Sequence, residues 1–387
     1  MSVSAYVSCL VALAAACGFP RHKGLTTPSK TVIINARVFN GTGYSQPAHL
    51  VLVGQQISNA NPSGGTIVDA QGGYLLPGFI DGHCHVQNCS DLTLLRQYGV
   101  TTALDMGTYP YSFTQSCNGV GITNVLGTGQ AGTVNGSTIS LIPGTPSSQF
   151  IPNVTAGEMF VKNRVAEGVQ WIKVFLDLPD FGPTPDVLTS VVETAHQNDR
   201  LVVTHAPSYA DYQEAYNAAA DLICHAPLDK VVDAALNANL TNAQRSIRAI
   251  VPTLIMMQSI VNNTGLPYSD YVNHAEASVT SMLAAGVDIV LGTDANTSPY
   301  VPANPPFGLA FHQELKLLVA AGLTPLQAIN AGTVGVARAF QLYDRGIIET
   351  GLRADLVLLS KDPLQDISNS CSIQKVWVAG VEYSGPF

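Results

Sequence analysis

The chain has 387 residues, of which 46% are hydrophobic and 12% are charged, and its formal net charge is −9 at pH 7. The charged fraction is about half of the usual share, yet the hydrophobic content is too high for a disordered chain. An acidic balance without a cluster of Lys and Arg argues against a nucleic-acid partner. The body of the chain has no apolar run of the ~18 residues that a membrane-spanning helix needs, so we expect a globular protein without a membrane partner.

The N-terminus carries a short apolar stretch of small residues, Ala5–Phe19. Its length and composition are typical of a signal peptide, with cleavage options near Ala14 and Ala16. The preceding Met1–Ser4 lacks Lys and Arg, so a buried N-terminal helix is the alternative. We expect residues 1–19 to be a signal peptide and the protein to be secreted, with a cytoplasmic location as the alternative. Sequons for N-glycosylation favour secretion, and they lie at Asn40, Asn88, Asn135, Asn153, Asn239, Asn262 and Asn296.

Seven cysteines are spread from Cys9 to Cys371 without CxxC spacing. This pattern predicts neither a disulfide framework nor a structural zinc site. One or two disulfides are compatible with it, and the sequence leaves their pairing open.

Short segments with β character lie near both ends of the chain. Alternating or β-branched residues and Gly, Asn and Pro turns predict strands before residue 77, and two more follow the last predicted helix. We therefore predict a small β-sandwich domain built from residues 31–76 plus 345–387. The predicted strands are Thr31–Phe39, His49–Val53, Thr66–Asp69, Gly73–Leu76, Asp355–Leu359 and Lys375–Val381.

After Pro77 the pattern changes to an alternation of strands and helices, which is typical of parallel βα units. Several of these strands are continuous apolar runs, as expected for strands that are buried on both faces. Eight of them predict an α/β fold, a (β/α)8 TIM barrel over residues 77–344. The strands are Gly78–His83, Thr101–Met106, Asn124–Gly127, Trp171–Leu176, Leu201–His205, Asp221–His225, Ala249–Met256 and Asp288–Thr293.

Helical patterns separate most of these strands, and two follow the last one. The Gly-, Ser- and Thr-rich segment Val120–Pro152 is the least regular part of the barrel. It is either a lid over the barrel mouth or a passive surface excursion. The predicted helices are Ala156–Glu167, Pro185–Gln197, Tyr209–Ala219, Tyr271–Ala285, Phe311–Ala321 and Pro325–Phe340.

Metal-ligand residues follow several predicted strands, at the end where barrel enzymes place their active sites. His83 and His85 close the first strand and face the same side, whereas Cys84 points the other way. Two imidazoles in this arrangement are a favourable pair of metal ligands. A carboxylate at the same level can bind a metal ion and accept a proton from metal-bound water. Three further strands end in such residues, namely His205, His225 and Asp294.

Lys173 lies inside the apolar fourth strand. A buried Lys is costly unless it is paired or functional, and burial favours its neutral amine. One interpretation is a buried salt bridge with Asp177 or Asp105. The other is a carbamate formed with carbon dioxide, which is an anionic oxygen ligand that can bridge two metal ions.

Three motifs resemble those of the amidohydrolase superfamily. Residues Pro77–His85 are similar to its first-strand motif, and Gly292–Asp294 to its eighth-strand motif. Residues Phe311–Asp366 resemble the closing segment of the imidazolonepropionase-like and metal-dependent prolidase branch, for which fungal secreted amidases are the nearest analogy. The resemblance covers residues 31–382. The closing segment matches at His312–Leu315, Gly332–Thr333 and Gly351–Val357.

The resemblance implies a binuclear, zinc-dependent amidohydrolase that acts on an amide or peptide-like C–N bond of a small-molecule substrate. It implies that a metal-bridging hydroxide attacks this bond and that Asp294 acts as general base and then as general acid. It assigns His83, His85 and Asp294 to the first metal ion, His205 and His225 to the second, and an N6-carboxylated Lys173 to the bridge between them.

The resemblance does not extend to the substrate. Ala-Pro follows both His205 and His225, where relatives often differ, and no Arg is clearly placed to bind a substrate carboxylate. Candidate pocket residues are Tyr209, Tyr212 and His312, with a structural role as the alternative for each. Two other functions stay open: hydrolysis of cyclic amides, lactones or carbamates, or decarboxylation, at the same metal site, and a non-catalytic secreted binding protein. A homo-oligomer is compatible with the sequence.

Overall fold

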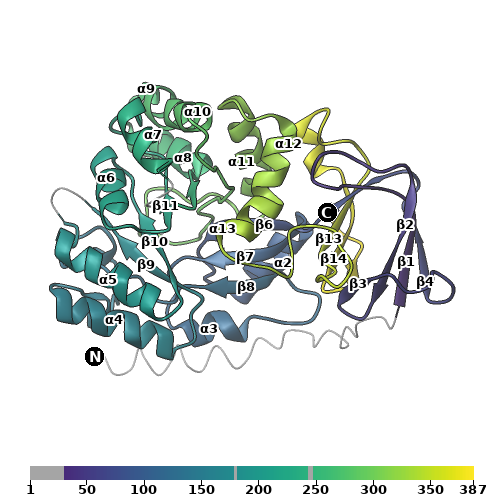
Figure 1. The fold of residues 1–387 in the computed structure, drawn as a ribbon, viewed down its shortest axis with the longest axis horizontal. Helices are drawn as coiled ribbons and strands as arrows, with labels where there is room; N and C mark the ends of the chain where they lie inside the picture. The colour runs from purple at the N-terminus through teal and green to yellow at the C-terminus, as the bar shows by residue number, and fades with distance from the viewer. Residues whose placement is uncertain (1–29, 178–180, 243–246) are drawn as a thin grey trace, which may run out of the picture.

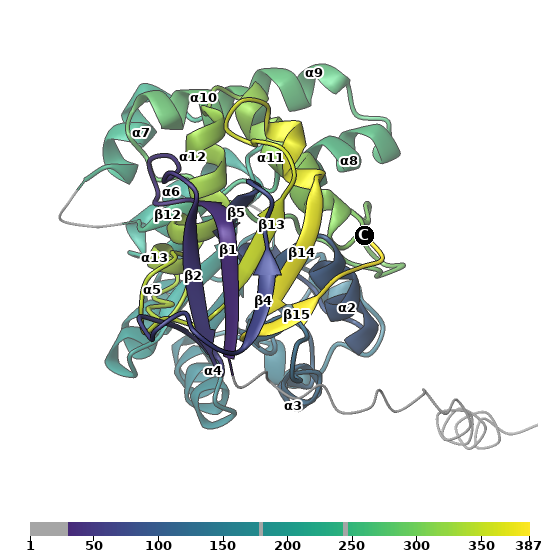
Figure 2. The ribbon, with the colours of Figure 1, turned by 90° about the vertical axis from the view of Figure 1, so that its right-hand side faces the viewer.

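The computed structural model describes residues 30–177, 181–242 and 247–387. The predicted signal peptide lies outside these residues. Within them, the chain forms a barrel of strands and helices with a smaller β-domain against one side (Figures 1 and 2). Each helix in these ranges is too short or too polar to cross a membrane.

Among the described residues, seven regular strands build the barrel as two parallel sheets. In one sheet β6, β7 and β8 pair in chain order, and in the other β9, β10, β11 and β12 do so. The strands are β6 (Phe79–Cys84), β7 (Val100–Asp105), β8 (Asn124–Gly127), β9 (Trp171–Phe175), β10 (Leu201–His205), β11 (Leu222–Cys224) and β12 (Ala249–Val251).

Single parallel bridges join the two sheets into a ring. A bridge between Gly132 and Val174 connects the chain after β8 to β9. On the other side, residues 288–295 take the eighth position between β12 and β6, through bridges made by Ile289 and Ala295. This is the (β/α)8 arrangement that the sequence predicts, with an eighth strand held by isolated bridges in place of a regular ladder.

Side chains alternate between two cores along the barrel strands, as a period of two requires. Ile80 packs with Leu104 and Val203, which come from three different strands, in a cluster that fills the barrel. Its neighbour Phe79 packs in a larger cluster between the strands and the surrounding helices. Strands buried on both faces account for the continuous apolar runs in the sequence.

Helices alternate with the strands and surround the barrel (Figure 1). Two π-helical turns, η3 (Tyr271–Glu276) and η4 (Ala331–Gly335), precede α10 and α13. The helices are α2 (Cys89–Gln97), α3 (Tyr111–Ser116), α4 (Val154–Ala166), α5 (Pro185–Gln197), α6 (Tyr209–Asn217), α7 (Ala234–Leu240), α8 (Leu254–Thr264), α9 (Tyr268–Asp270), α10 (Ala277–Ala284), α11 (Leu309–Ala320), α12 (Pro325–Asn330) and α13 (Val336–Ala339).

The prediction of one strand over Ala249–Met256 is wrong in its second half. β12 ends at Val251, and α8 begins at Leu254. Pro252 has no N–H for a strand ladder, and Thr253 adopts a left-handed conformation with φ +46°. Pro252 and Thr253 end the strand and start the helix. The surrounding apolar run has no periodicity that would distinguish a strand from a helix.

The small domain is built from both ends of the described chain. Its strands follow the order β15-β14-β13-β5-β1-β2-β3, and β4 also pairs with β1. Ile33, Leu52, Leu75 and Trp377 are at most 1% exposed and form part of its core. Figure 2 shows its N-terminal and C-terminal strands side by side. They are β1 (Lys30–Val38), β2 (Ala48–Val53), β3 (Gln56–Ser58), β4 (Thr66–Asp69), β5 (Tyr74–Pro77), β13 (Leu356–Leu359), β14 (Ile373–Val378) and β15 (Val381–Tyr383).

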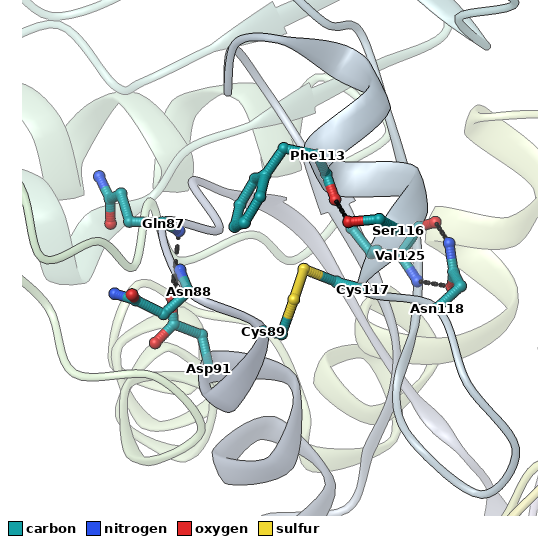
Figure 3. Close-up of a disulfide and its surroundings, with 9 residues drawn as sticks. All are labelled: Gln87, Asn88, Cys89, Asp91, Phe113, Ser116, Cys117, Asn118 and Val125. Atoms are coloured by element: carbon teal, nitrogen blue, oxygen red, sulfur yellow. Dashed lines mark hydrogen bonds between the residues drawn. A yellow bond between two sulfur atoms is a disulfide. The ribbon is translucent and has the colours of Figure 1, made fainter. Parts of the chain in front are cut away.

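A disulfide joins Cys89, the first residue of α2, to Cys117, which follows α3 (Figure 3). Among the described residues, Cys84, Cys224 and Cys371 are free thiols. The sequence leaves the disulfide pairing open, and the structure pairs Cys89 with Cys117.

The irregular segment Val120–Pro152 holds β8 and two 3-10 turns, η1 (Ile139–Leu141) and η2 (Ser147–Gln149). Thr138 donates its N–H and its hydroxyl to one carboxylate oxygen of Asp177, each at 2.8 Å. Since Asp177 lies two residues beyond β9, this contact fastens the segment near the end of the strand that carries Lys173.

Candidate metal centre

Two histidines at the end of β6 and one aspartate converge on a single point. His83 lies in β6 and is 1% exposed, and His85 follows the strand directly after Cys84. One carboxylate oxygen of Asp294 lies 3.0 Å from Nε2 of His85 and 3.5 Å from Nε2 of His83. Ligand atoms of the three residues all lie within 4.8 Å of one another, which is close enough for one metal ion to bind all three.

Asp81 connects the strand of His83 to the eighth position of the barrel. Its buried carboxylate accepts hydrogen bonds from the N–H of His83 at 3.2 Å, and from the N–H and the hydroxyl of Thr293 at 3.1 and 2.6 Å. Burial raises the pKa of Asp81 to about 7, although these hydrogen bonds oppose the shift. The next residue, Asp294, donates its N–H to the carbonyl of His83 at 2.7 Å. Asp81 thereby fixes two of the three candidate ligands relative to each other.

His205 and His225 extend this group across the barrel mouth. The ring centroid of His225 lies 4.9 Å from that of His83 and 4.4 Å from that of His205. Phe175 stacks on His205 at 4.2 Å. The three imidazoles therefore form a row from β6 to β10, as the ends of neighbouring barrel strands allow.

Backbone strain and burial both mark these candidate ligands. His225 and Asp294 are non-glycine residues with φ of +77° and +57°, and such strain concentrates at functional sites. Burial, followed by the positive charge of neighbours, holds the pKa of His83, His205 and His225 well below the usual value. The neutral imidazole is the form that binds a metal ion.

Lys173 is fully buried in β9, and its Nζ has no carboxylate or other oxygen partner among the described residues, although the thiol of Cys224 lies close enough to raise its pKa. Neither Asp105 nor Asp177 forms the salt bridge with Lys173 that one interpretation of the sequence requires. Asp105 accepts hydrogen bonds from Val86 and Thr108, and Asp177 accepts those of Thr138. Burial lowers the pKa of Lys173, which favours the neutral amine that can react with carbon dioxide.

The donor set fits divalent metal ions. Four imidazoles and a carboxylate are ligands that zinc prefers. Two buried polar atoms beside them, Nδ1 of His83 and Nζ of Lys173, have no oxygen partner in the described part of the chain, and a buried unpartnered polar atom calls for an explanation such as an ion. The structure thus brings His83, His85 and Asp294 within reach of one ion, with the rings of His225 and His205 beside them. The assignment of all six candidate ligands to a metal centre stays a prediction.

The three predicted pocket residues lie in different surroundings. Tyr212 is fully buried and donates its hydroxyl to the carbonyl of His225 at 2.7 Å. His312 is 1% exposed, with Nε2 3.0 Å from the carbonyl of Tyr98 and Nδ1 2.9 Å from the hydroxyl of Ser370. These contacts are structural and leave no exposed surface for a substrate, whereas Tyr209 is partly exposed.

One neighbour of the site escapes the sequence analysis altogether. The hydroxyl of Thr253 lies 2.9 Å from Nδ1 of His225. The sequence analysis places Thr253 inside a continuous strand, Ala249–Met256. The residue is therefore not recognised as lying just beyond a strand end, where barrel enzymes carry functional residues. Its signal in the sequence is Pro252, which a central strand does not accommodate.

With this geometry in place, comparison with known proteins identifies the family. The model of the amidohydrolase family matches residues 74–382. The chain belongs to the amidohydrolase family. The match spans the barrel and the C-terminal strands of the small domain, and it includes every proposed ligand.

Curated relatives are distant. The adenine deaminase 2 of Desulfotalea psychrophila is 24% identical over 325 residues, which are 81% of this chain and 50% of that protein. The imidazolonepropionase of Deinococcus deserti is 34% identical over 105 residues, which are 26% of this chain and 24% of that protein. The chain spans about half the length of the adenine deaminases that it matches.

Solved structures share the fold. A Xaa-Pro dipeptidase with bound methionine has a TM-score of 0.78 at 19% identity, covering 92% of this chain and 100% of that one. The ochratoxinase of A. niger has a TM-score of 0.74 at 20% identity, covering 93% of this chain and 96% of that one. These likenesses confirm the amidohydrolase fold, a TIM barrel with a small domain.

Proposed function

We propose that the chain is a binuclear metal-dependent hydrolase of amide or peptide-like C–N bonds in small molecules. The observation that carries this proposal is the convergence of four imidazoles, a carboxylate and an unpaired buried lysine at one end of the barrel. The family match and the dipeptidase-like structures support the same reaction class.

Each ligand has a defined place in this proposal. His83, His85 and Asp294 would hold one cation, and His205 and His225 would hold the other. The neutral amine of Lys173 would attack carbon dioxide and lose a proton, and the resulting carbamate would supply anionic oxygen ligands to the metal ions. When bound, two divalent cations, which we take to be zinc, polarise the substrate carbonyl and activate water for attack.

Asp294 supplies the proton transfers. Its carboxylate lies at the level of the ligands, within 3.0 Å of Nε2 of His85. It accepts a proton from the attacking water and donates this proton to the nitrogen of the leaving amine, so that the C–N bond breaks without releasing an unprotonated amine anion.

Metal analysis coupled to a substrate panel tests this proposal. We expect about two divalent ions per purified chain, loss of hydrolysis after chelation, and recovery when zinc is returned. The panel contains N-acyl amino acids, dipeptides, cyclic amides and lactones. A chain that holds no divalent metal, or that hydrolyses a substrate equally well after chelation, contradicts the proposal.

The curated relatives favour a second candidate at the same site. Their names are those of adenine deaminases and imidazolonepropionases. Hydrolysis at a ring carbon, either of a cyclic amide or with release of an amine from a heterocycle, needs the same activated water. Cleavage of ring substrates without cleavage of linear amides in the panel selects this candidate.

We also propose that the protein is secreted. The disulfide between Cys89 and Cys117 supports an oxidising compartment, since disulfides are rare in the cytosol. Expression of the full chain in a secreting host tests this. Secretion with cleavage near residues 14–19 supports the proposal, and retention of the intact chain inside the cell contradicts it.

A further inference from the structure

A line of contacts runs from helix α11 to the metal centre. Glu314 of α11 is fully buried, and its two carboxylate oxygens accept the N–H groups of Leu254 and Ile255 at 2.9 and 2.7 Å. These are the first two residues of α8, whose N–H groups have no partner inside the helix. The two oxygens of Glu314 satisfy both N–H groups, and these hydrogen bonds oppose the burial that raises the pKa of Glu314 to about 8.

Thr253, the residue before α8, links this contact of Glu314 to the metal centre. Thr253 is fully buried and has φ +46° and ψ +47°, a left-handed conformation that a β-branched residue rarely adopts. Such a conformation persists only where the surroundings hold it. Here the clamp of Glu314 on Leu254 and Ile255 fixes the chain immediately after Thr253.

This conformation aims the hydroxyl of Thr253 at His225, with 2.9 Å between Oγ1 and Nδ1. Nδ1 of His225 lies closer to this hydroxyl than to Oδ2 of Asp294, which is 3.8 Å away. When Nδ1–H donates to the hydroxyl, the lone pair of Nε2 is left free for a metal ion. Histidine ligands in metal sites commonly have such a partner on the other ring nitrogen, because it fixes the tautomer and the ring orientation.

We propose that Glu314 and Thr253 are positioning residues of the metal centre: Glu314 clamps the start of α8, and Thr253 thereby orients His225 as a metal ligand. This inference rests on the proposed function and assigns a role to the carboxylate of the His312–Leu315 motif. His225 has a second support in Tyr212, whose hydroxyl donates to its carbonyl, so the backbone stays in place when the ring loses its partner.

Thr253→Val and Thr253→Ser test the hydroxyl directly. Valine keeps the shape and removes the hydroxyl, whereas serine keeps the hydroxyl. The matched control is Thr123→Val. Thr123 is also fully buried, and its hydroxyl donates to the carbonyl of Val100 at 2.6 Å, at the opposite end of the barrel strands. Glu314→Gln tests the clamp.

The primary measurement is the release of bound zinc to a chelator, followed without any substrate. We expect Thr253→Val to release one of two zinc ions about 10- to 100-fold faster than the unaltered chain. Thr253→Ser and Thr123→Val should release both ions at the unaltered rate. Glu314→Gln should accelerate release of the same single ion. In the cobalt-substituted protein, the visible absorption bands should change in Thr253→Val and stay the same in Thr123→Val.

Two results separate this inference from the proposed function. If the unaltered chain binds two ions and Thr253→Val releases both at the unaltered rate, the positioning role is refuted and the proposed function stands. Equal acceleration in Thr123→Val also refutes it, because a general loss of packing then explains the effect. If the unaltered chain binds no divalent ion, the proposed function itself fails and the inference falls with it.

Discussion

Lys173 is the residue whose environment most clearly separates a structural role from a chemical one. A buried ammonium without an anionic partner is unstable, so an unmodified lysine is a poor structural element at this position. We expect Lys173→Ala to reduce kcat/KM by about 100-fold or more, since it removes a bridging ligand from the metal centre. Short carboxylates added to the variant should restore part of the activity, because they can occupy the vacated position. Steady-state kinetics with and without such carboxylates measure this, and a fully active variant removes the carbamate model.

His312 provides a prediction for stability at the residue scale. Its Nε2 lies 3.0 Å from a carbonyl and must donate, while Nδ1 pairs with the hydroxyl of Ser370. Burial lowers the pKa of His312 from 6.5 to about 4. Between these two values the unfolded chain binds a proton that the folded chain does not. The free energy of unfolding should therefore fall as the pH falls from 6.5 to about 4, by up to about 3 kcal/mol from this group.

Urea denaturation at several pH values measures this dependence. In His312→Gln the side chain cannot titrate, and its amide can still donate to the carbonyl of Tyr98. The variant should lose less stability than the unaltered chain does over the pH range from 6.5 to about 4. An identical loss in both proteins would show that His312 is not the group responsible.

At the scale of elements, the irregular segment Val120–Pro152 is the part of the barrel whose role the sequence leaves most open. Its link to the end of β9 is the pair of hydrogen bonds from Thr138 to Asp177. If the segment is a lid, loosening this link should weaken substrate binding more than it slows the chemical step. If it is a passive excursion, loosening the link should change neither.

Thr138→Val tests the link, because it removes one of the two donors and keeps the size of the side chain. We expect about a 5-fold rise in KM with a much smaller change in kcat, and faster proteolysis within the segment, since a hydrogen bond to a carboxylate contributes about 1 kcal/mol or more. The matched control is Thr145→Val, whose native hydroxyl donates only to carbonyls of the same segment. Unchanged KM and unchanged proteolysis in Thr138→Val would favour a passive excursion.

The elements also show what the sequence can and cannot predict. The end of β10 at His205 is predictable, and so is the end of β6 to within one residue of His83, because a polar ligand follows apolar residues at both places. The start of α8 is not, because the apolar run Ala249–Met256 fits a buried strand and a buried helix equally well. The contact between Thr253 and His225 joins positions 28 residues apart, and such pairs depend on the three-dimensional arrangement of the chain.

At the scale of the whole molecule, the metal centre draws its candidate ligands from around the entire barrel. They come from β6, β9, β10, the end of β11 and the eighth position. Isolated bridges join the eighth position to its neighbours, as one also joins the chain after β8 to β9, so among the described residues the ring closes beside Asp294 without a regular ladder. Bound metal ions should therefore stabilise the closed ring as well as support the reaction.

We expect removal of the metal ions to lower the melting temperature of the full chain. A ligand present at about 1,000 times its dissociation constant stabilises the folded state by about 4 kcal/mol, which corresponds to a shift of about 5 °C for a protein of this size. Calorimetry before and after chelation, and after zinc is returned, measures the shift. Hydrogen exchange should increase first in residues 288–295. The variant His85→Ala, which lacks one ligand, should show a smaller shift than the unaltered chain. Equal melting temperatures of the unaltered chain with and without metal would show that the ring closes without help from the ions.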